Sequence, residues 1–496
     1  MVYNEINRIT IAGLKGSSGK TVLSLGLARE WKRRGLAVAA FKKGPDYIDA
    51  RWLTLAAGAE CRALDTYLGS ESNVYRSFVE NSRDADISVI EGNRGIFDGM
   101  DYKGTYSTAE VAKLIKSPVV LVIDCAKTTR TAAVAVMGCR AMDPQLDMAG
   151  IVVNNVANDR HSETLKSCIE AETGLPVLGS IPRLRDFPFP ERHLGLVMPL
   201  EHEAAEEAVE AAAGLVRDYV DIDALFKIAG RAHPLDIPSV DEKEINKVLA
   251  GVKVGVVKDA AFSFYYPENM DQLRKEGATI VEIDAIADNC LPEVDALYIG
   301  GGFPETLADK LAGNESFRNS VKNAALNGLP VYAECGGAMY LGESILYKGS
   351  TYPMAGALPI TYEVCAKPQG HGYTELEVEL ENPFYGVGKK LRGHEFHYSR
   401  VLTWKREDIN LVMNNLRGRG FDGSFDGVCK NNVLALYSHV NDLYGGAGWA
   451  RALVNAAVRH SECTEGGKVS NVGCIRAGKD GASICDTESF GAGIDG

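Results

Sequence analysis

The chain has 496 residues, of which 46% are hydrophobic and 24% charged, and its formal net charge is −13. These values are ordinary for a globular protein of two or three domains, and the acidic balance argues against a basic surface for nucleic acid. We find no apolar run of about 18 residues and no signal-peptide pattern, so we expect a cytoplasmic protein outside the membrane with free thiols.

The first half of the chain alternates short apolar runs with stretches long enough for helices. A helix is expected over 20–34, since it follows a glycine-rich turn and ends at Gly35. Continuous apolar strands between helices are typical of a parallel sheet covered on both faces. The expected strands are 8–13, 36–41, 86–90, 118–123, 149–153 and 176–179. We assign residues 1–225 to this domain.

A second α/β series follows a break in this pattern. Residues 232–240 contain two prolines and no apolar periodicity, so we place a linker at 226–250. New apolar strands begin at 252 and recur at 279–283, 294–299 and 330–333. The sequence therefore predicts a second α/β domain over 251–448. A tail rich in Gly and Ser, 461–496, is expected to be disordered.

A phosphate-binding loop is predicted between the first strand and the first helix. Glycines let the backbone turn its N–H groups toward phosphates, Lys20 would reach the β- and γ-phosphates, and Thr21 would bind Mg²⁺. Leu14 stands where the standard spacing has a glycine, so the loop is a deviant type with an additional early lysine, Lys15. A plain Gly/Ser turn is the alternative. The amide of Asn154 offers a donor and an acceptor to the nucleotide base. The expected nucleotide-binding residues are Gly13, Lys15, Gly16, Ser17, Ser18, Gly19, Lys20, Thr21 and Asn154.

Carboxylates follow the second and third expected strands. Asp46 and Asp49 come after the strand at 36–41, and Glu91 and Asp98 come after the strand at 86–90. Parallel sheets of this kind bind ligands at the carboxyl ends of their strands, and Mg²⁺ prefers hard oxygen ligands. We therefore expect Thr21, Asp46 and Glu91 to hold Mg²⁺ beside ATP. A helix cap is the alternative role for a single Asp at this place.

A nucleophile elbow is predicted around Cys335. Ala-Glu-Cys-Gly-Gly, 333–337, has a strand before it and a helix start after it, so the turn exposes the thiol at a helix N-terminus. Gly301 and Gly302 end another strand, and with Gly336 they are the expected oxyanion-binding residues. His439 is the expected base. The alternatives are a small buried core thiol for the cysteine and a satisfied core histidine for the base.

Seven motifs resemble one family in their order along the chain. The sequence is similar to the cobyrinate a,c-diamide synthases, which join a dethiobiotin-synthetase-like ATP domain to a class I glutamine amidotransferase domain. The resemblance implies a parallel-sheet P-loop NTPase domain followed by an α/β amidotransferase domain. Ordinary class I amidotransferases carry a Glu two residues after the His, where Asn441 stands here, so a Cys335–His439 pair without a third acid is implied. The motifs are 15–21, 44–49, 97–99, 190–196, 300–305, 333–337 and 393–399.

The resemblance implies a ligase with two sites. ATP would convert a carboxylate of a tetrapyrrole to an acyl phosphate, and ammonia from glutamine would displace the phosphate, at two acetate side chains called a and c. Asp46, Asp49, Glu91 and Asp98 match acidic positions of the family, with Asp49 and Asp98 expected at the substrate and the division of roles left open. Arg130 and Arg192 are expected to bind carboxylates of the substrate.

The expected partners of this ligase are small molecules. They are ATP, L-glutamine and an anionic metallo-tetrapyrrole, with Mg²⁺ as a cofactor and with no nucleic acid or membrane. The sequence leaves a homodimer open.

The segment after Glu91 distinguishes two substrates. It reads Asn93-Arg94-Gly95-Ile96, where cobyrinate enzymes more often carry apolar residues. In this respect the chain is most similar to the methanogen branch, the nickel-sirohydrochlorin a,c-diamide synthases of coenzyme F430 biosynthesis. We therefore predict nickel-sirohydrochlorin as the substrate, with cobyrinate, in cobalamin biosynthesis, as the alternative.

Two other classes of protein share parts of this pattern. A ParA-like partitioning ATPase would explain the phosphate loop but not Cys335 and its glycines. A tetrapyrrole carrier with a degenerate ligase fold would not need intact Lys20, Glu91 and Cys335. The sequence favours the ligase over both.

Overall fold

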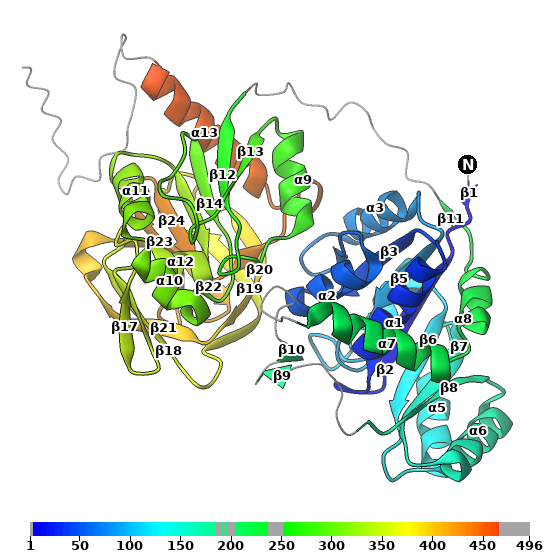
Figure 1. Cartoon of the computed structure of the whole chain (residues 1–496). Helices are drawn as coiled ribbons and strands as arrows, with labels where there is room; N and C mark the ends of the chain where they lie inside the picture. The colour runs from blue at the N-terminus through cyan, green and yellow to red at the C-terminus, as the bar shows by residue number, and fades with distance from the viewer. Residues whose placement is uncertain (1–2, 185–190, 193–194, 197–203, 237–250, 466–496) are drawn as a thin grey trace, which may run out of the picture.

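The computed structural model describes residues 3–184, 191–192, 195–196, 204–236 and 251–465 and shows two α/β domains (Figure 1). The first domain contains a seven-stranded sheet in the order β4-β3-β5-β2-β6-β7-β8, and all of its pairs are parallel. The six predicted strands are confirmed, and β4 is an additional strand of three residues. The strands are β2 (Arg8–Gly13), β3 (Val38–Lys43), β4 (Arg62–Leu64), β5 (Ile87–Glu91), β6 (Val119–Asp124), β7 (Met148–Val156) and β8 (Val177–Pro182).

Helices cover both faces of this sheet, as the continuous apolar strands predict. One core lies between the sheet and α1, α2, α7 and α8, and another lies between the sheet and α4, α5 and α6. Gly26 allows α1 to approach α7 closely, because a Cβ there would lie 2.4 Å from Cγ2 of Val216. The helices are α1 (Lys20–Arg33), α2 (Tyr47–Ala57), α3 (Glu71–Ser82), α4 (Thr108–Leu114), α5 (Arg130–Met142), α6 (Asp159–Thr173), α7 (Ala205–Tyr219) and α8 (Ile222–Ala229).

The first domain continues beyond residue 225, where we placed the start of the linker. Helix α8 buries Leu225 and Ile228, and β11 (Leu235–Asp236) pairs with β1 (Tyr3–Asn4). Burial of this apolar face ties α8 to the domain that precedes it. Residues 237–250 lie outside the described part of the chain.

The second domain contains a ten-stranded sheet in the order β13-β12-β14-β15-β24-β23-β22-β19-β20-β25. Its first five strands are parallel and the remaining pairs are antiparallel. The strands are β12 (Lys253–Val257), β13 (Thr279–Ile283), β14 (Ala296–Ile299), β15 (Val331–Glu334), β19 (Gly370–Val378), β20 (Lys390–His397), β22 (Asn410–Arg417), β23 (Phe425–Lys430), β24 (Val433–Leu436) and β25 (His439–Val440).

A four-stranded sheet and five helices complete the second domain. Helix α13 extends this domain beyond residue 448 and into the predicted tail, since Trp449, Leu453 and Val454 are buried. Residues 466–496 lie outside the described part. The sheet is formed by β16 (Ser344–Tyr347), β17 (Ser350–Pro353), β18 (Ile360–Val364) and β21 (Ser399–Trp404), and the helices are α9 (Pro267–Lys275), α10 (Ala308–Gly313), α11 (Glu315–Leu326), α12 (Gly336–Leu341) and α13 (Trp449–Glu465).

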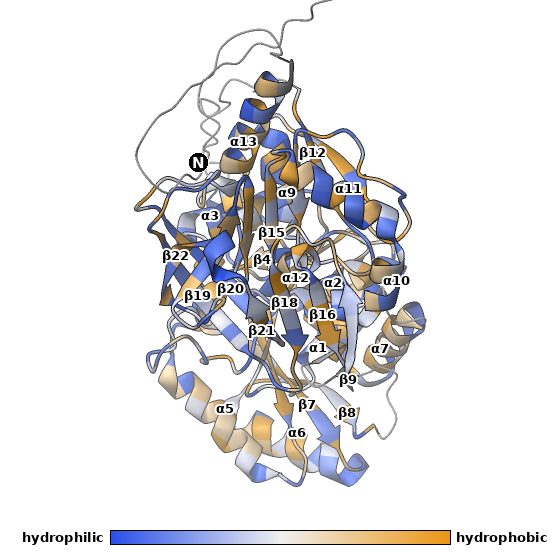
Figure 2. Ribbon diagram, turned by 90° about the vertical axis from the view of Figure 1, so that its left-hand side faces the viewer, coloured by the Kyte–Doolittle hydropathy of each residue, from blue (hydrophilic) through white to orange (hydrophobic). Residues whose placement is uncertain are grey.

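Hydrophobic residues follow the central strands of both domains, while the covering helices carry both hydrophobic and hydrophilic residues (Figure 2). None of the described helices has the length and apolarity needed to cross a membrane.

The two domains touch along β4 and the loop that follows it. Arg62 forms an ion pair with Asp271 of α9 at 2.6 Å. The hydroxyl of Tyr373, on β19, donates to Oδ2 of Asp65 at 2.7 Å, and the two rings of Tyr67 and Tyr373 pack 4.3 Å apart. Because of these contacts, the carboxyl ends of the strands of the first sheet face the second domain.

Candidate active site

One cavity of about 1060 Å³ lies between the domains and is lined by both predicted centres. The first domain lines the cavity with the phosphate loop and with the carboxylates that follow β3 and β5. The second domain lines it with the cysteine elbow and the predicted base. The structure therefore brings residues from opposite ends of the chain to one space. The predicted residues that line it are Gly16, Ser17, Ser18, Gly19, Lys20, Thr21, Asp46, Asp49, Glu91, Asp98, Asn154, Gly302, Cys335 and His439.

The phosphate loop is held in shape by its own lysines and by Asn154. Gly19 has φ of 101°, and a Cβ there would lie 2.3 Å from Nδ2 of Asn154, so the position requires glycine. Asn154 donates to the Ser18 carbonyl at 2.9 Å. Nζ of Lys20 donates to the carbonyls of Lys15 at 3.3 Å and Arg94 at 2.9 Å. The side chain of Asn154 thus supports the loop. The sequence did not predict this role for Asn154.

Two predicted loop residues do not line the cavity itself. Gly13 lies beneath Lys20, since a Cβ there would be 3.0 Å from Cδ of Lys20. Nζ of Lys15 forms an ion pair with Asp124 at 3.0 Å, and its side chain is 63% exposed.

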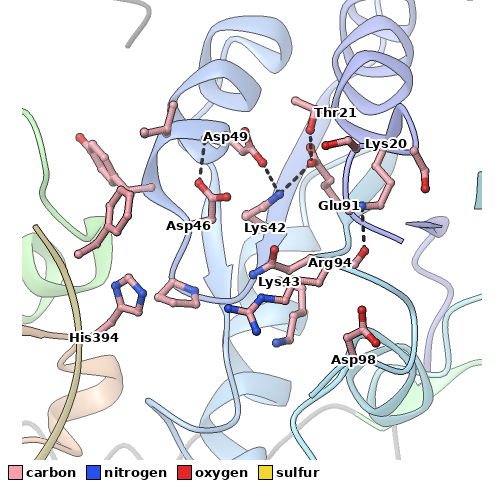
Figure 3. Close-up of a pocket in the computed structure, with 18 of the residues that line it drawn as sticks. Lys20, Thr21, Lys42, Lys43, Asp46, Asp49, Glu91, Arg94, Asp98 and His394 are labelled. Atoms are coloured by element: carbon pink, nitrogen blue, oxygen red, sulfur yellow. Dashed lines mark hydrogen bonds and ion pairs between the residues drawn. The ribbon is translucent and has the colours of Figure 1, made fainter. Parts of the chain in front are cut away.

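A buried lysine organises the carboxylates beside the loop (Figure 3). Nζ of Lys42 contacts Oδ2 of Asp49 at 2.6 Å and Oε1 of Glu91 at 2.8 Å, and Thr21 donates to Oε1 of Glu91 at 2.7 Å. Burial opposes the charge of Lys42, but the two carboxylates outweigh it and hold its pKa well above the usual value. Sequence reasoning missed Lys42, although a lysine at the end of an apolar strand was a visible signal.

Asp46 has two roles in the structure. It caps α2, since its Oδ1 accepts the Asp49 N–H at 3.2 Å, and it also lines the cavity. Burial, followed by the charge of Asp49, raises the pKa of Asp46 to about 7. Asp98 lies on the other side of the loop, where its Oδ2 accepts the Gly95 N–H at 2.9 Å.

The backbone at Cys335 forms the predicted turn between a strand and a helix, but the residue is buried rather than exposed. Cys335 has φ of 47° between β15 and α12, a strained conformation for a residue with a side chain. Gly336 and Gly337 allow the turn to approach the end of β14, because a Cβ on Gly337 would lie 2.2 Å from the Ile299 carbonyl oxygen and one on Gly336 would lie 3.1 Å from Gly302 N. Burial raises the pKa of the Cys335 thiol, so the thiol needs a base.

His439 is oriented by an acid that the sequence analysis did not expect. Its Nδ1 lies 3.1 Å from Oε2 of Glu334, the residue before the cysteine. A carboxylate only accepts, so this contact places the imidazole proton on Nδ1 and leaves Nε2 as an acceptor. Among the described residues Nε2 has no partner. The expectation of a pair without a third acid is therefore corrected.

Asn441 stands at the position where a Glu is usual, and its side chain binds a backbone N–H group instead of His439. Its Oδ1 accepts the Leu443 N–H at 3.0 Å. Gly301 packs against the base, since a Cβ there would lie 2.4 Å from Cε1 of His439.

Stacked rings connect the two centres across the domain boundary. Tyr47, next to Asp46, stacks on Phe264 with ring centroids 4.3 Å apart, and Phe264 packs on the His439 ring at 4.1 Å. Neither aromatic residue was singled out from the sequence, because their contact exists only once the domains meet.

Of the two arginines predicted for substrate binding, the structure describes the side chain of Arg130 alone, and Arg130 does not lie at this site. Arg130 lies outside the cavity lining, its side chain is 76% exposed, and it pairs with Glu172 at 2.6 Å. The side chain of Arg192 lies outside the described residues. The structure therefore gives no support to a substrate role for Arg130.

The chain matches two family models and several curated relatives. A CobQ/CobB/MinD/ParA nucleotide binding domain matches residues 9–197, and a CobB/CobQ-like glutamine amidotransferase domain matches residues 253–442. A cobyrinate a,c-diamide synthase from Magnetococcus marinus is 40% identical over 450 residues, covering 90% of this chain and 96% of the relative. One from Archaeoglobus fulgidus is 41% identical over 442 residues, covering 88% and 95%.

A solved structure of a putative GMP synthase subunit from Thermoplasma acidophilum covers 43% of this chain and 98% of its own, with a TM-score of 0.32 and 19% identity. The two family models fall on the two domains of the fold, and the curated relatives cover both domains together. The chain therefore belongs to the family of cobyrinate a,c-diamide synthases.

Proposed function

We propose that this protein is an ATP-dependent ligase that uses glutamine to amidate the a and c acetate side chains of cobyrinate. One observation carries the proposal: the phosphate loop with its carboxylates lines the same cavity as Cys335 and His439, and Glu334 contacts His439 from behind. The names of the relatives support a glutamine-dependent amidation of a tetrapyrrole. They favour cobyrinate over the nickel-sirohydrochlorin that we predicted from the segment after Glu91.

The second domain would release ammonia from glutamine. Nε2 of His439 takes the proton of the Cys335 thiol as sulfur attacks the amide carbon, and the N–H groups around Gly302 and Gly336 bind the oxyanion. The protonated His439 then gives its proton to the leaving ammonia, and afterwards activates the water that hydrolyses the thioester. Glu334 holds the ring in the required tautomer throughout.

The first domain would activate the carboxylate. The phosphate loop binds ATP, and Lys20 neutralises charge on the phosphoryl group while it passes to an oxygen of the substrate carboxylate and ADP leaves. Ammonia then attacks the acyl phosphate and inorganic phosphate departs. Asp49 and Asp98 line the cavity where the acceptor carboxylate and the ammonia would meet.

The residues beside the loop fit Mg²⁺. Thr21, Asp46 and Glu91 offer hard oxygen atoms, and Oε2 of Glu91 is buried with no partner among the described residues. Those residues contain no group of three or more His, Cys, Asp or Glu arranged to bind a metal. Mg²⁺ that is shared with phosphates and waters needs only one or two carboxylates. Bound there, the ion would neutralise charge on the phosphates.

Removal of the Glu334 carboxylate should slow glutamine hydrolysis. Glu334→Gln keeps the size of the side chain but allows the wrong imidazole tautomer, so we expect kcat for glutamine hydrolysis to fall about 10²-fold. Steady-state glutaminase assays measure this. Amidation with ammonium salts should be nearly unchanged. An unchanged glutaminase kcat would show that Glu334 does not orient His439.

Magnesium dependence should change with pH through Asp46. Because its pKa is raised to about 7, Asp46 is protonated below that pH, and a proton competes with the metal. The Mg²⁺ concentration for half-maximal ATP use should therefore rise about tenfold for each pH unit below about 7 and level off above it. In Asp46→Asn this pH dependence should disappear. Equal magnesium requirements at about pH 6 and about pH 8 in the natural protein would contradict the assignment.

Nickel-sirohydrochlorin is the second candidate substrate. The segment Asn93-Arg94-Gly95-Ile96 favours it, and Arg94 lines the cavity. The protein should be incubated with ATP, Mg²⁺, glutamine and each tetrapyrrole in turn. Mass spectrometry should show two conversions of carboxyl to amide on cobyrinate. Diamidation of nickel-sirohydrochlorin alone would overturn our choice of substrate, and no amidation of either would overturn the proposed function.

A further inference from the structure

Two cations of the first domain face the cavity without an anionic partner. Lys43 ends β3 and is only 5% exposed, and Arg94 lies in the loop after β5. Both line the cavity, and Figure 3 shows their side chains next to each other, away from the phosphate loop. The side chain of neither makes a hydrogen bond or ion pair with another described residue. A buried ammonium without a partner is costly, so this arrangement points to an anion that arrives with a ligand.

The acids nearest to this pair are already engaged. Asp65 accepts from the Tyr373 hydroxyl and from the backbone of Tyr67, and Glu110 accepts the Tyr106 N–H at 2.9 Å. Burial lowers the pKa of Lys43, the charge of Asp65 partly opposes this effect, and the charge of Arg94 lowers the pKa further. The two cations therefore repel each other, and no described carboxylate forms an ion pair with either of them.

The other lysines of the first-domain site each have a polar partner among the described residues. Lys42 is paired with Asp49 and Glu91, and Lys15 is paired with Asp124. Lys20 donates to two carbonyls. Of these five cations, only the side chains of Lys43 and Arg94 lack a polar partner among the described residues.

The backbone at Arg94 is held so that its side chain enters the cavity. Its φ is 50°, in the left-handed region that a side chain disfavours, and its carbonyl accepts from Nζ of Lys20. One residue thus fixes the phosphate-loop lysine with its carbonyl and leaves its guanidinium free. Strain of this kind persists where the surrounding structure enforces it, commonly at a ligand site.

The pair faces the second domain. Burial is the main cause that lowers the pKa of His371 and of His394, and the charge of Arg94 adds to it for both histidines, which line the same cavity. Arg94 therefore acts on the side of the cavity that the second domain forms.

We propose that Lys43 and Arg94 bind a carboxylate of the tetrapyrrole that is not being amidated, and so determine which carboxylate reaches the phosphate loop. This inference rests on the proposed function, because the tetrapyrrole is its substrate. A guanidinium fork and an ammonium suit a carboxylate, and the macrocycle carries several around its rim. The protein has a net charge of −13, so an anionic substrate needs local cations of this kind.

Equilibrium binding of cobyrinate tests this proposal without any chemical step. The absorption spectrum of the corrin is followed during titration at low salt, without ATP or glutamine, and ATP binding is measured separately by calorimetry. Arg94→Gln and Lys43→Met should each raise the Kd for cobyrinate about tenfold, and the double variant by more. Arg94→Lys should raise the Kd for cobyrinate less than Arg94→Gln does. Arg130→Gln, which removes an exposed arginine outside the cavity, should bind as the natural protein does.

Two results would overturn the proposal. One is a double variant whose Kd for cobyrinate stays within about twofold of the natural value. The other is an equal loss of ATP and cobyrinate affinity, which would assign the pair to phosphate instead. Arg94 is exposed in a loop, so its variant tests the proposal even if Lys43→Met fails to fold. If the proposed function itself were wrong, the result would be distinguishable, because the natural protein would then bind no tetrapyrrole.

Discussion

Replacement of Cys335 by alanine is expected to lower glutamine-dependent amidation by at least about 10³-fold while amidation with ammonium salts persists. The thiol of Cys335 is the group at the elbow that can form the thioester, and the neighbouring Gly336 and Gly337 carry no side chain that could replace it. Ammonia from solution can still enter the cavity and reach the acyl phosphate. Product formation should be measured with each nitrogen donor at matched ATP and tetrapyrrole concentrations.

Cys290→Ala is the matched control for this variant. Cys290 is a free, exposed cysteine of the same domain and does not line the cavity. It should show natural activity with both donors. If Cys335→Ala lost the ammonium-dependent reaction as completely as the glutamine-dependent one, the scheme of two separate centres would fail.

Lys20→Ala, unlike Cys335→Ala, is expected to lower amidation with both nitrogen donors, in each case about 10³-fold. Nζ of Lys20 lies at the centre of the phosphate loop, held by two carbonyls and with its charge unpaired by a direct salt bridge. Without it, negative charge on the transferring phosphoryl group is not neutralised. Release of ADP and formation of amide should fall together, whereas hydrolysis of glutamine at Cys335 should remain measurable.

Lys227→Ala, on the exposed face of α8, serves as the control, because it removes a lysine of the same domain outside the cavity. Amidation by Lys20→Ala within about tenfold of the natural rate would mean that the loop does not bind the reacting phosphates.

The parts of the site that the sequence predicts are those whose chemistry is local. The phosphate loop and the elbow at Cys335 each combine a strand, glycines and a helix start within a few residues, so their backbone geometry follows from the sequence. The strands of the first sheet follow from continuous apolar runs such as Val119–Asp124. Strand β4, with three residues, is too short to give such a pattern.

The parts that the sequence does not predict depend on contacts between distant residues. Glu334 contacts His439 only because β15 and β24 pair in one register, which brings positions 105 residues apart together. The stack of Tyr47 on Phe264 needs both domains in place. Arg130 seemed suited to a carboxylate substrate by its place in a loop, but Glu172 neutralises it in the structure.

The source of the nitrogen atoms in the two new amides tests most directly whether the two centres work through one cavity. The protein should be given cobyrinate, ATP, Mg²⁺ and glutamine labelled with heavy nitrogen in its side-chain amide, in a buffer that contains excess unlabelled ammonium. If ammonia passes from Cys335 to the phosphate loop inside the shared cavity, mass spectrometry will find the label in both new amides. A product whose amides carry the unlabelled nitrogen of the buffer would contradict this account.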